Sequence, residues 1–183
     1  YDPNEPGKCV YGGRLNRTLT TVLEPGSTMK PLVAAAAMEE GVFRPKDRIF
    51  CENGAWSPRR GRTITDAHGY GWLSFADCVI KSSNIGLAKV GRRMGARRLE
   101  RYCRALGFGR PTELGIPGES PGKLRPLKQW TRDSVLSIPF GHEISVTPIQ
   151  LVSAYSAVVN GGGLHRPQPR REPRDLMRPV PDQ

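Results

Sequence analysis

The stretch Glu24-Pro25-Gly26-Ser27-Thr28-Met29-Lys30-Pro31 predicts a sharp turn that leads directly into a helix. A Pro-Gly pair breaks regular structure, and a proline such as Pro31 is tolerated only near the start of a helix. The Ala-rich residues 32–40 favour continuation of that helix, and Gly41 would end it. Ser27 and Lys30 are three residues apart, so this turn places them on one face of the helix start.

Ser27 and Lys30 fit the chemistry of acyl transfer. A serine hydroxyl becomes a good nucleophile when a neighbouring base takes its proton, and a lysine with a lowered pKa can be that base. The free N–H groups of a helix start can also stabilise a developing oxyanion. A simple N-cap is the alternative role for Ser27. A second S-x-x-K, from Ser120 to Lys123, lies in a Pro/Gly-rich loop and is interpreted as chance.

The second motif, Ser82-x-Asn84, lies between two predicted helices, 71–80 and 85–94. Its hydroxyl could pass a proton between base, nucleophile and leaving group, and its amide could hold a backbone group of a substrate. Serine and asparagine also serve as cap and turn residues between helices, so a structural role is the alternative. S-x-x-K followed by S-x-N forms two thirds of a signature shared by β-lactamases and penicillin-binding proteins.

The rest of the chain divides into short elements and irregular segments. Residues 1–13 are rich in turn formers, and residues 15–23 carry the β-formers of a strand. We expect residues 42–70 to be irregular, with a hairpin near Asn53-Gly54 and short extended pieces around Ile49 and Ile64. Further helices are predicted over 96–106 and 146–159, the latter with Pro148 in its first turn. Residues 165–183 hold five prolines and five arginines, which fits a linker, an edge strand or a frayed end.

The charge balance is strongly basic. The 183 residues carry 28 Lys and Arg against 17 Asp and Glu, a net charge of +11. Such a balance suggests anionic partners, but the basic residues are scattered along the chain. The densest group has helical spacing and is interpreted as a solvated helix face rather than a docking surface: Arg92, Arg93, Arg97, Arg98, Arg101 and Arg104. No stretch approaches the ~18–20 apolar residues of a membrane-spanning helix.

Cysteine and histidine usage predicts no metal site and no cofactor. Cys9, Cys51, Cys78 and Cys103 are too far apart in sequence for a CxxC pair, and the three histidines lack ligand spacing. Disulfides are possible in an oxidising compartment, and buried free thiols are the simpler interpretation.

Taken together, the motifs resemble the transpeptidase domain of class B penicillin-binding proteins, the peptidoglycan D,D-transpeptidases of septal and lateral wall synthesis. The resemblance spans almost the whole chain. Its pieces are Leu15-Asn16-Arg17, Glu24 to Pro31, Asp66-Ala67-His68, Lys81 to Gly86, Phe140 to Gln150, Ala154-Tyr155 and Asn160-Gly161-Gly162. The resemblance implies an α+β fold like that of β-lactamases and transpeptidases, here the helical part with an incomplete antiparallel sheet. Residues 1–164 would form the helical core, and 165–183 would lead toward sheet strands not present.

The resemblance also implies roles for the motif residues. Ser27 would attack the penultimate D-Ala of a stem peptide, Lys30 would be its base, Ser82 would relay the proton and Asn84 would bind the acyl peptide. β-Lactams would acylate the same Ser27. His68 and His142 are given no catalytic role and are interpreted as structural.

The resemblance extends to setting and partners. It implies that the parent protein lies at the extracytoplasmic face of the bacterial inner membrane, anchored by an N-terminal helix not present here. Its partners would be stem peptides, a wall glycosyltransferase and the division or elongation machinery, with no nucleic acid.

One departure from the family pattern concerns its third motif. No K-[ST]-G occurs in the 183 residues, so we expect a partial domain that turns over poorly alone. Two alternatives remain open. One is a β-lactam sensor or a β-lactamase of the same fold. A β-lactamase would deacylate bound penicillin quickly. The other is a non-catalytic basic module that binds polyanions in a salt-sensitive manner, unaffected by Ser27→Ala.

Overall fold

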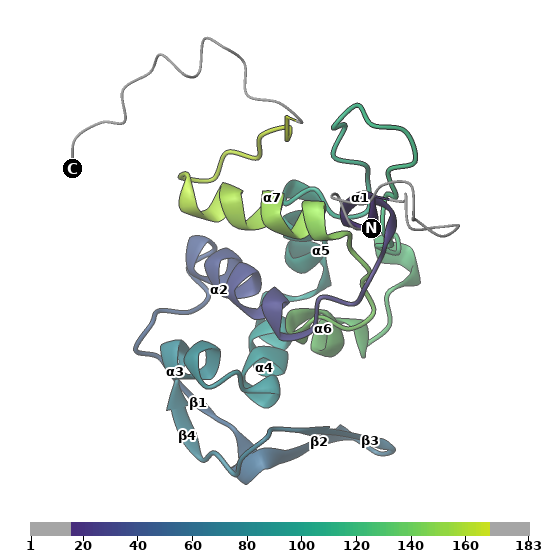
Figure 1. The fold of residues 1–183 in the computed structure, drawn as a ribbon. Helices are drawn as coiled ribbons and strands as arrows, with labels where there is room; N and C mark the ends of the chain where they lie inside the picture. Colours follow the sequence, from purple (N-terminus) through teal and green to yellow (C-terminus); the bar gives the residue numbers. More distant parts are fainter. Residues whose placement is uncertain (1–15, 169–183) are drawn as a thin grey trace, which may run out of the picture.

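The computed structural model describes residues 16–168, and its centre is a group of packed helices with two small hairpin-like sheets at one edge (Figure 1). The elements in chain order are α1 (Arg17–Thr20), the 3-10 turn η2 (Gly26–Thr28), α2 (Met29–Glu39), β1 (Arg48–Phe50), η3 (Glu52–Gly54), β2 (Ala55–Arg59), β3 (Arg62–Thr65), β4 (Trp72–Ser74), α3 (Phe75–Ile80), α4 (Asn84–Met94), α5 (Ala96–Ala105), η4 (Leu127–Gln129), α6 (Ser134–Ser137), η5 (Ile138–Phe140) and α7 (Pro148–Val159). The mostly helical α+β fold confirms the predicted fold class.

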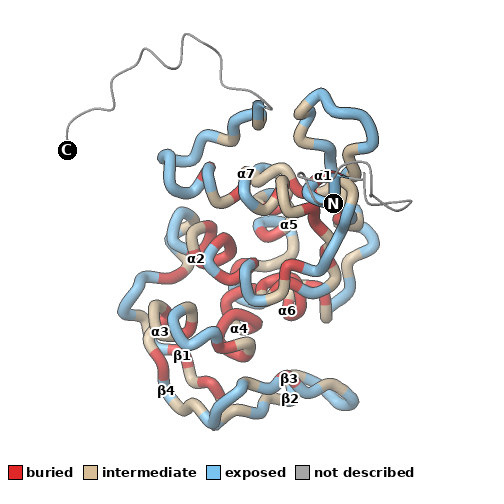
Figure 2. Tube along the Cα trace, in the orientation of Figure 1, coloured by how far each residue is buried: buried red, intermediate tan, exposed pale blue. Residues whose placement is uncertain are grey.

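The core is formed mainly by α2 and α4, whose inward faces are buried (Figure 2). Three of the seven buried residues of α2 are alanines, which allow close packing against its neighbours. In α4, Gly91 faces Pro139 so closely that a Cβ would lie 2.2 Å from the proline ring. Because α4 packs against both α2 and η5, the ends of α2 and α4 that carry the two motifs are held in fixed relative positions.

Both sheets are antiparallel and two-stranded. In one, β1 pairs with β4, with Ile49 opposite Leu73. In the other, β2 pairs with β3, with Trp56 opposite Ile64. The extended pieces predicted around Ile49 and Ile64 are therefore confirmed.

Several helix predictions are also confirmed. The helix after Ser27 ends at Glu39, and Gly41 follows with a φ of +63°. The helices expected over 85–94, 96–106 and 146–159 are α4, α5 and α7. In α7, Pro148 occupies the first turn and Thr147 forms a capping box with Gln150.

Three local predictions are wrong. The strand expected over 15–23 is replaced at residues 17–20 by the helical turn α1, because the Asn16 side chain caps it by accepting from the Thr18 N–H at 3.2 Å. The hairpin turn lies at residues 60–61 rather than at Asn53-Gly54, which forms η3. The helix expected from residue 71 starts at Phe75, since residues 72–74 pair with β1 and Ser74 caps α3.

Some predictions concern residues outside the described range, namely the turn-rich segment 1–13, Cys9 and most of the Pro/Arg-rich end. Within residues 16–168, no helix is long and apolar enough to cross a membrane. The same residues contain no group of three or more His, Cys, Asp or Glu side chains arranged to hold a metal ion.

Candidate active site

Ser27 lies exposed in the 3-10 turn η2, directly before α2. Its side chain makes no capping hydrogen bond, so the simple N-cap role is not observed. The turn is held by its neighbour Thr28, whose hydroxyl donates to the Pro25 carbonyl at 2.6 Å. The Thr28 carbonyl in turn accepts from the Tyr155 hydroxyl of α7 at 2.7 Å. The Ser27 hydroxyl is therefore exposed on a turn that is tied at both ends.

The segment leading to Ser27 is fixed against residues 141–146. Leu23 and Val146 form an isolated antiparallel bridge with hydrogen bonds of 3.0 and 2.9 Å. The Gly26 N–H donates to the Gly141 carbonyl at 3.1 Å. A Cβ on Gly141 would lie 2.0 Å from the Gly26 oxygen, a distance that no side chain could occupy. Residues 141–146 thus support the turn that carries Ser27.

Lys30 lies one turn after Ser27 and is 1% exposed, which is unusual for a lysine. Its ammonium donates to the Ser82 carbonyl at 2.5 Å, to the Ser82 hydroxyl at 2.8 Å and to the Asn84 side-chain oxygen at 2.8 Å. Burial lowers the pKa of Lys30 from 10.5 to about 8, against the attraction of the Asp66 carboxylate, which raises it. A lysine with this pKa can release its proton near neutral pH.

Ser82 occupies the corner between α3 and α4 with a φ of +55°, in the left-handed region. The Ser82 N–H donates to the Val79 carbonyl at 3.0 Å and the Ser83 N–H to the Cys78 carbonyl at 2.8 Å. This is the Schellman pattern of a helix end, in which glycine is the usual residue at the left-handed position. A serine there costs about 1–2 kcal/mol relative to its favoured conformations. Its presence at this cost suggests that the hydroxyl has a function.

The start of α4 is held by Asp66, whose only signal in the sequence is its place in the Asp66-Ala67-His68 stretch of the family resemblance. One carboxylate oxygen accepts from the N–H groups of Asn84 at 2.6 Å and Ile85 at 3.0 Å. The other accepts from the Ser83 hydroxyl at 2.6 Å. These bonds satisfy N–H groups that a helix start leaves free, and they fix the S-x-N corner in place.

The Asn84 amide is oriented by one hydrogen-bond donor and one hydrogen-bond acceptor. Its oxygen accepts from the Lys30 ammonium, and its nitrogen donates to the Thr65 carbonyl at the end of β3 at 2.9 Å. Because an ammonium can only donate and a carbonyl can only accept, the amide has one favourable orientation. The β2–β3 hairpin therefore contributes directly to the geometry of the site.

Replacing Ser82 with glycine should separate folding from chemistry. Glycine relieves the left-handed strain but removes one acceptor of Lys30, so the free energy of unfolding should stay within about 1 kcal/mol of wild type. Acylation by a penicillin should fall by about 100-fold if the hydroxyl relays a proton. Urea denaturation and acylation kinetics measure the two effects.

Ser82→Ala is the matched control, because it also lacks the hydroxyl but keeps the Cβ. It should lose acylation equally and be less stable than Ser82→Gly by about 1 kcal/mol. Normal acylation in either variant would exclude a role for the hydroxyl.

The structure thus brings Lys30, Ser82 and Asn84 into one hydrogen-bonded group and places Ser27 on the same continuous segment as Lys30. In the described part of the chain, the hydrogen bonds of the Lys30 ammonium go to Ser82 and Asn84. The catalytic roles of the four residues remain predictions.

His68 and His142 are both exposed at the surface. His68 packs edge-on against Tyr70, with ring centroids 5.7 Å apart, and His142 pairs with Glu24 at 3.0 Å. The second S-x-x-K lies outside any helix, as expected.

The arginine-rich face of α4 and α5 makes many contacts within the chain. Arg98 and Arg101 pair with Glu40, and Arg104 pairs with Glu100. Arg92 lies over the Trp56 ring and Arg93 over the Phe43 ring. These contacts favour the interpretation of a helix face over that of a docking surface.

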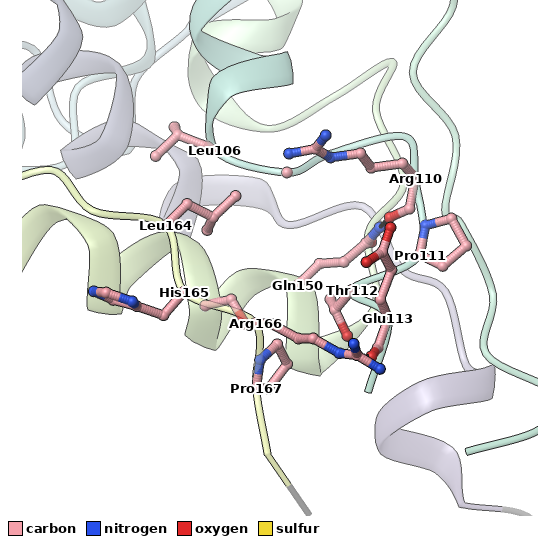
Figure 3. Close-up of a pocket in the computed structure, with 12 residues that line it drawn as sticks. Leu106, Arg110, Pro111, Thr112, Glu113, Gln150, Leu164, His165, Arg166 and Pro167 are labelled. Carbon is pink, nitrogen blue, oxygen red and sulfur yellow. Dashed lines mark hydrogen bonds between the residues drawn. The ribbon is translucent and has the colours of Figure 1, made fainter. Parts of the chain in front are cut away.

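A cavity of about 190 Å³ lies between the end of α5, the loop at 110–113 and residues 164–167 (Figure 3). Gln150 of α7 lines it and ties two loops together by donating to the carbonyls of Arg110 and Pro121, at 2.7 and 2.9 Å. None of the four candidate site residues lines this cavity, and we assign it no role in the chemistry.

Comparisons with known sequences agree with the motifs. A family model described as the penicillin binding protein transpeptidase domain matches residues 1–172. A probable peptidoglycan D,D-transpeptidase, PbpC of Pseudomonas aeruginosa, is 34% identical over 98% of this chain and 32% of its own length. The peptidoglycan D,D-transpeptidase FtsI of Escherichia coli is 34% identical over 91% of this chain and 28% of its own length. The chain thus spans about a third of these relatives.

Solved structures give the same result. The transpeptidase domain of Burkholderia pseudomallei penicillin-binding protein 3 matches with a TM-score of 0.81 and 35% identity, over 84% of this chain and 46% of that one. Penicillin-binding protein 3 of Mycobacterium tuberculosis, solved with aztreonam, matches with a TM-score of 0.77 and 31% identity, over 84% of this chain and 34% of that one. The motifs, the fold and these matches agree: the chain belongs to the penicillin-binding protein transpeptidase family, with relatives among the class B proteins.

Proposed function

We propose that this chain carries the acylation site of a serine peptidoglycan D,D-transpeptidase. Ser27 attacks the carbonyl carbon of the penultimate D-Ala of a stem peptide and forms an ester, and the terminal D-Ala leaves with a proton on its amine. An amino group of a neighbouring stem then attacks the ester and restores the Ser27 hydroxyl. β-Lactams acylate the same oxygen.

The observation that carries this proposal is the buried Lys30 ammonium, bonded to Ser82 and Asn84 one turn from Ser27. Neutral Lys30 accepts the Ser27 proton as the new bond forms. The pKa of about 8 makes this neutral form available near neutral pH. The backbone N–H of Ser27, in the turn η2 directly before α2, provides one half of the oxyanion hole.

Ser82 is the proposed proton relay. The Ser82 hydroxyl can accept a hydrogen bond from Lys30 and donate its own proton to another group. It can therefore pass a proton from Lys30 toward the leaving amine. Asn84 holds the acyl peptide through its amide, whose orientation is already set by Lys30 and Thr65.

The setting is proposed from the family. The parent protein acts at the extracytoplasmic face of the bacterial inner membrane, anchored by an N-terminal helix outside this chain. Its partners are stem peptides, a wall glycosyltransferase and the division or elongation machinery. Residues 1–164 form the helical part of the domain, and 165–183 lead toward further sheet strands.

Intact mass after incubation with a labelled penicillin tests the proposal on the wild-type chain and on Ser27→Ala. We expect a stable adduct on the wild type and none on the variant. If the wild type stays unlabelled, the same test is made on a longer form that includes a K-[ST]-G motif. An unlabelled longer form would contradict the proposal and indicate a non-catalytic relative.

The decay of the adduct with time and a polyanion-binding measurement at several salt concentrations address the two alternatives. An adduct that is hydrolysed quickly would favour a β-lactamase. Tight, salt-sensitive polyanion binding that Ser27→Ala leaves unchanged, without any adduct, would favour a basic binding module.

A further inference from the structure

Two buried thiols lie in contact beneath the S-x-N corner. The sulfur atoms of Cys51 and Cys78 are 3.9 Å apart, and both residues are 0% exposed. Cys51 follows β1 and Cys78 lies in α3, so the contact joins the small β1–β4 sheet to the helix that leads into the motif. Both thiols are free in the structure, as is Cys103 of α5, in line with the simpler interpretation of the sequence.

The thiol pair is connected directly to the corner. The Ser83 hydroxyl lies 3.4 Å from the Cys51 sulfur and 2.6 Å from the Asp66 carboxylate. Gly86, in the first turn of α4, has no side chain, and a Cβ there would lie 2.6 Å from the Cys78 sulfur. The first turn of α4 therefore packs directly against the two sulfurs. A change in the distance between the sulfurs would shift Ser83 and the residues next to it.

The two thiols differ in acidity. Hydrogen bonding from Cys78, together with that from Ser83, lowers the pKa of Cys51 to about 7 against the opposing effect of burial. The pKa of Cys78 is raised, first by its bond to Cys51 and then by burial. These shifts belong to the closed corner, where the two sulfurs are in contact. In exchange, the nucleophile is whichever of the two thiols is first exposed as a thiolate.

We propose that Cys51 and Cys78 are a disulfide-forming pair that ties β1 to α3 beneath the S-x-N corner. The oxidant is a disulfide of an exchange partner. The thiolate of one of the two cysteines attacks one sulfur of that disulfide and releases one thiol of the partner. The thiolate of the other cysteine then attacks the sulfur of the first and releases the second thiol. Two protein thiols are oxidised and one partner disulfide is reduced, so electrons and protons balance.

Burial determines when the exchange occurs. A mixed disulfide cannot fit at two sites that are 0% exposed, so the reaction takes place before the corner closes during folding or when it opens locally. Bond formation brings the sulfurs from 3.9 Å to about 2.0 Å. The extracytoplasmic setting proposed above is an oxidising compartment, but the exchange in vitro does not depend on that setting or on the proposed activity.

The test is made on the Cys9→Ser form of the chain, because Cys9 lies outside the described residues and would complicate the mapping. The reduced, unfolded chain is refolded with oxidised and reduced glutathione, then unfolded, alkylated and digested for mass spectrometry. The folded chain is held with oxidised glutathione in parallel, which allows the reaction through local opening. We expect a linked peptide containing Cys51 and Cys78, alkylation of Cys103 alone, and a Tm raised by roughly 5–10 °C.

Two variants complete the test. Cys78→Ala should abolish the link, while Cys103→Ala, which also changes a buried cysteine, should leave it intact. Alkylation of all three thiols after both treatments would overturn the proposal, as would a link that includes Cys103. Because the readout is the mapped bond, failure of penicillin acylation would leave this result unaffected.

Discussion

Lys30→Arg should reduce the rate of penicillin acylation by about 1,000-fold or more, because arginine keeps the positive charge but cannot release a proton near neutral pH. In the wild type, the rate should increase with pH through about 8, as the neutral amine forms. Stopped-flow or gel-based acylation kinetics measure both effects. The pH is varied over roughly two units on each side of the Lys30 pKa of about 8. An unchanged rate and pH profile in Lys30→Arg would exclude Lys30 as the base.

Lys89→Arg is the matched control for this variant. Lys89 of α4 is also partly buried and donates to the Phe50 carbonyl at 2.6 Å and to Glu52 at 2.5 Å, away from the candidate site. Its replacement by arginine should leave acylation unchanged.

Lys30 should also make the free energy of unfolding depend on pH. The folded-state pKa of about 8 is below the unfolded value of 10.5, so the unfolded chain binds more protons between these values. The free energy of unfolding should therefore increase as pH increases from 8 to 10.5, by about 3 kcal/mol relative to Lys30→Met. Below pH 8 the two curves should run parallel.

Gly141→Ala should destabilise the chain by about 2–5 kcal/mol and remove most acylation activity. The added Cβ would lie 2.0 Å from the oxygen and 2.3 Å from the nitrogen of Gly26, and both are backbone atoms. The segment that carries Ser27 must then move away. Overpacking costs typically 1–3 kcal/mol, and the φ of +85° adds about 1–2 kcal/mol for any residue with a side chain.

Gly118→Ala separates these two contributions. Gly118 has the same φ of +85°, but a Cβ there would meet no atom within 4 Å. It should therefore cost only the conformational part, about 1–2 kcal/mol, and retain acylation. Equal stability of the two variants in urea denaturation would mean that contact with Gly26 does not matter.

The helical half of the fold was predictable from sequence because its signals are local. The Pro-Gly turn, the Ala-rich run and Gly41 together define α2, and Thr147 with Pro148 defines the start of α7. The order of the S-x-x-K and S-x-N motifs was enough to select Lys30, Ser82 and Asn84, which the structure brings together.

The remaining features depend on contacts between distant residues. Asp66 holds the start of α4, 18 residues further along the chain, so its sequence neighbours do not reveal its partners. The start of α3 was misplaced because strand pairing with residues 48–50 overrides the helical pattern at Trp72. Gly141 looks like any loop glycine until its approach to Gly26 is known.

The left-handed corner at Ser82 has a consequence for how such proteins evolve. Some serine codons become glycine codons by a single base change, and glycine is the residue that this backbone position accepts most easily. A lineage can therefore lose the hydroxyl in one mutation without selection acting against the fold. If Ser82 is the proton relay, descendants that keep the architecture but are acylated about 100-fold more slowly by penicillin are separated from active ancestors by one nucleotide.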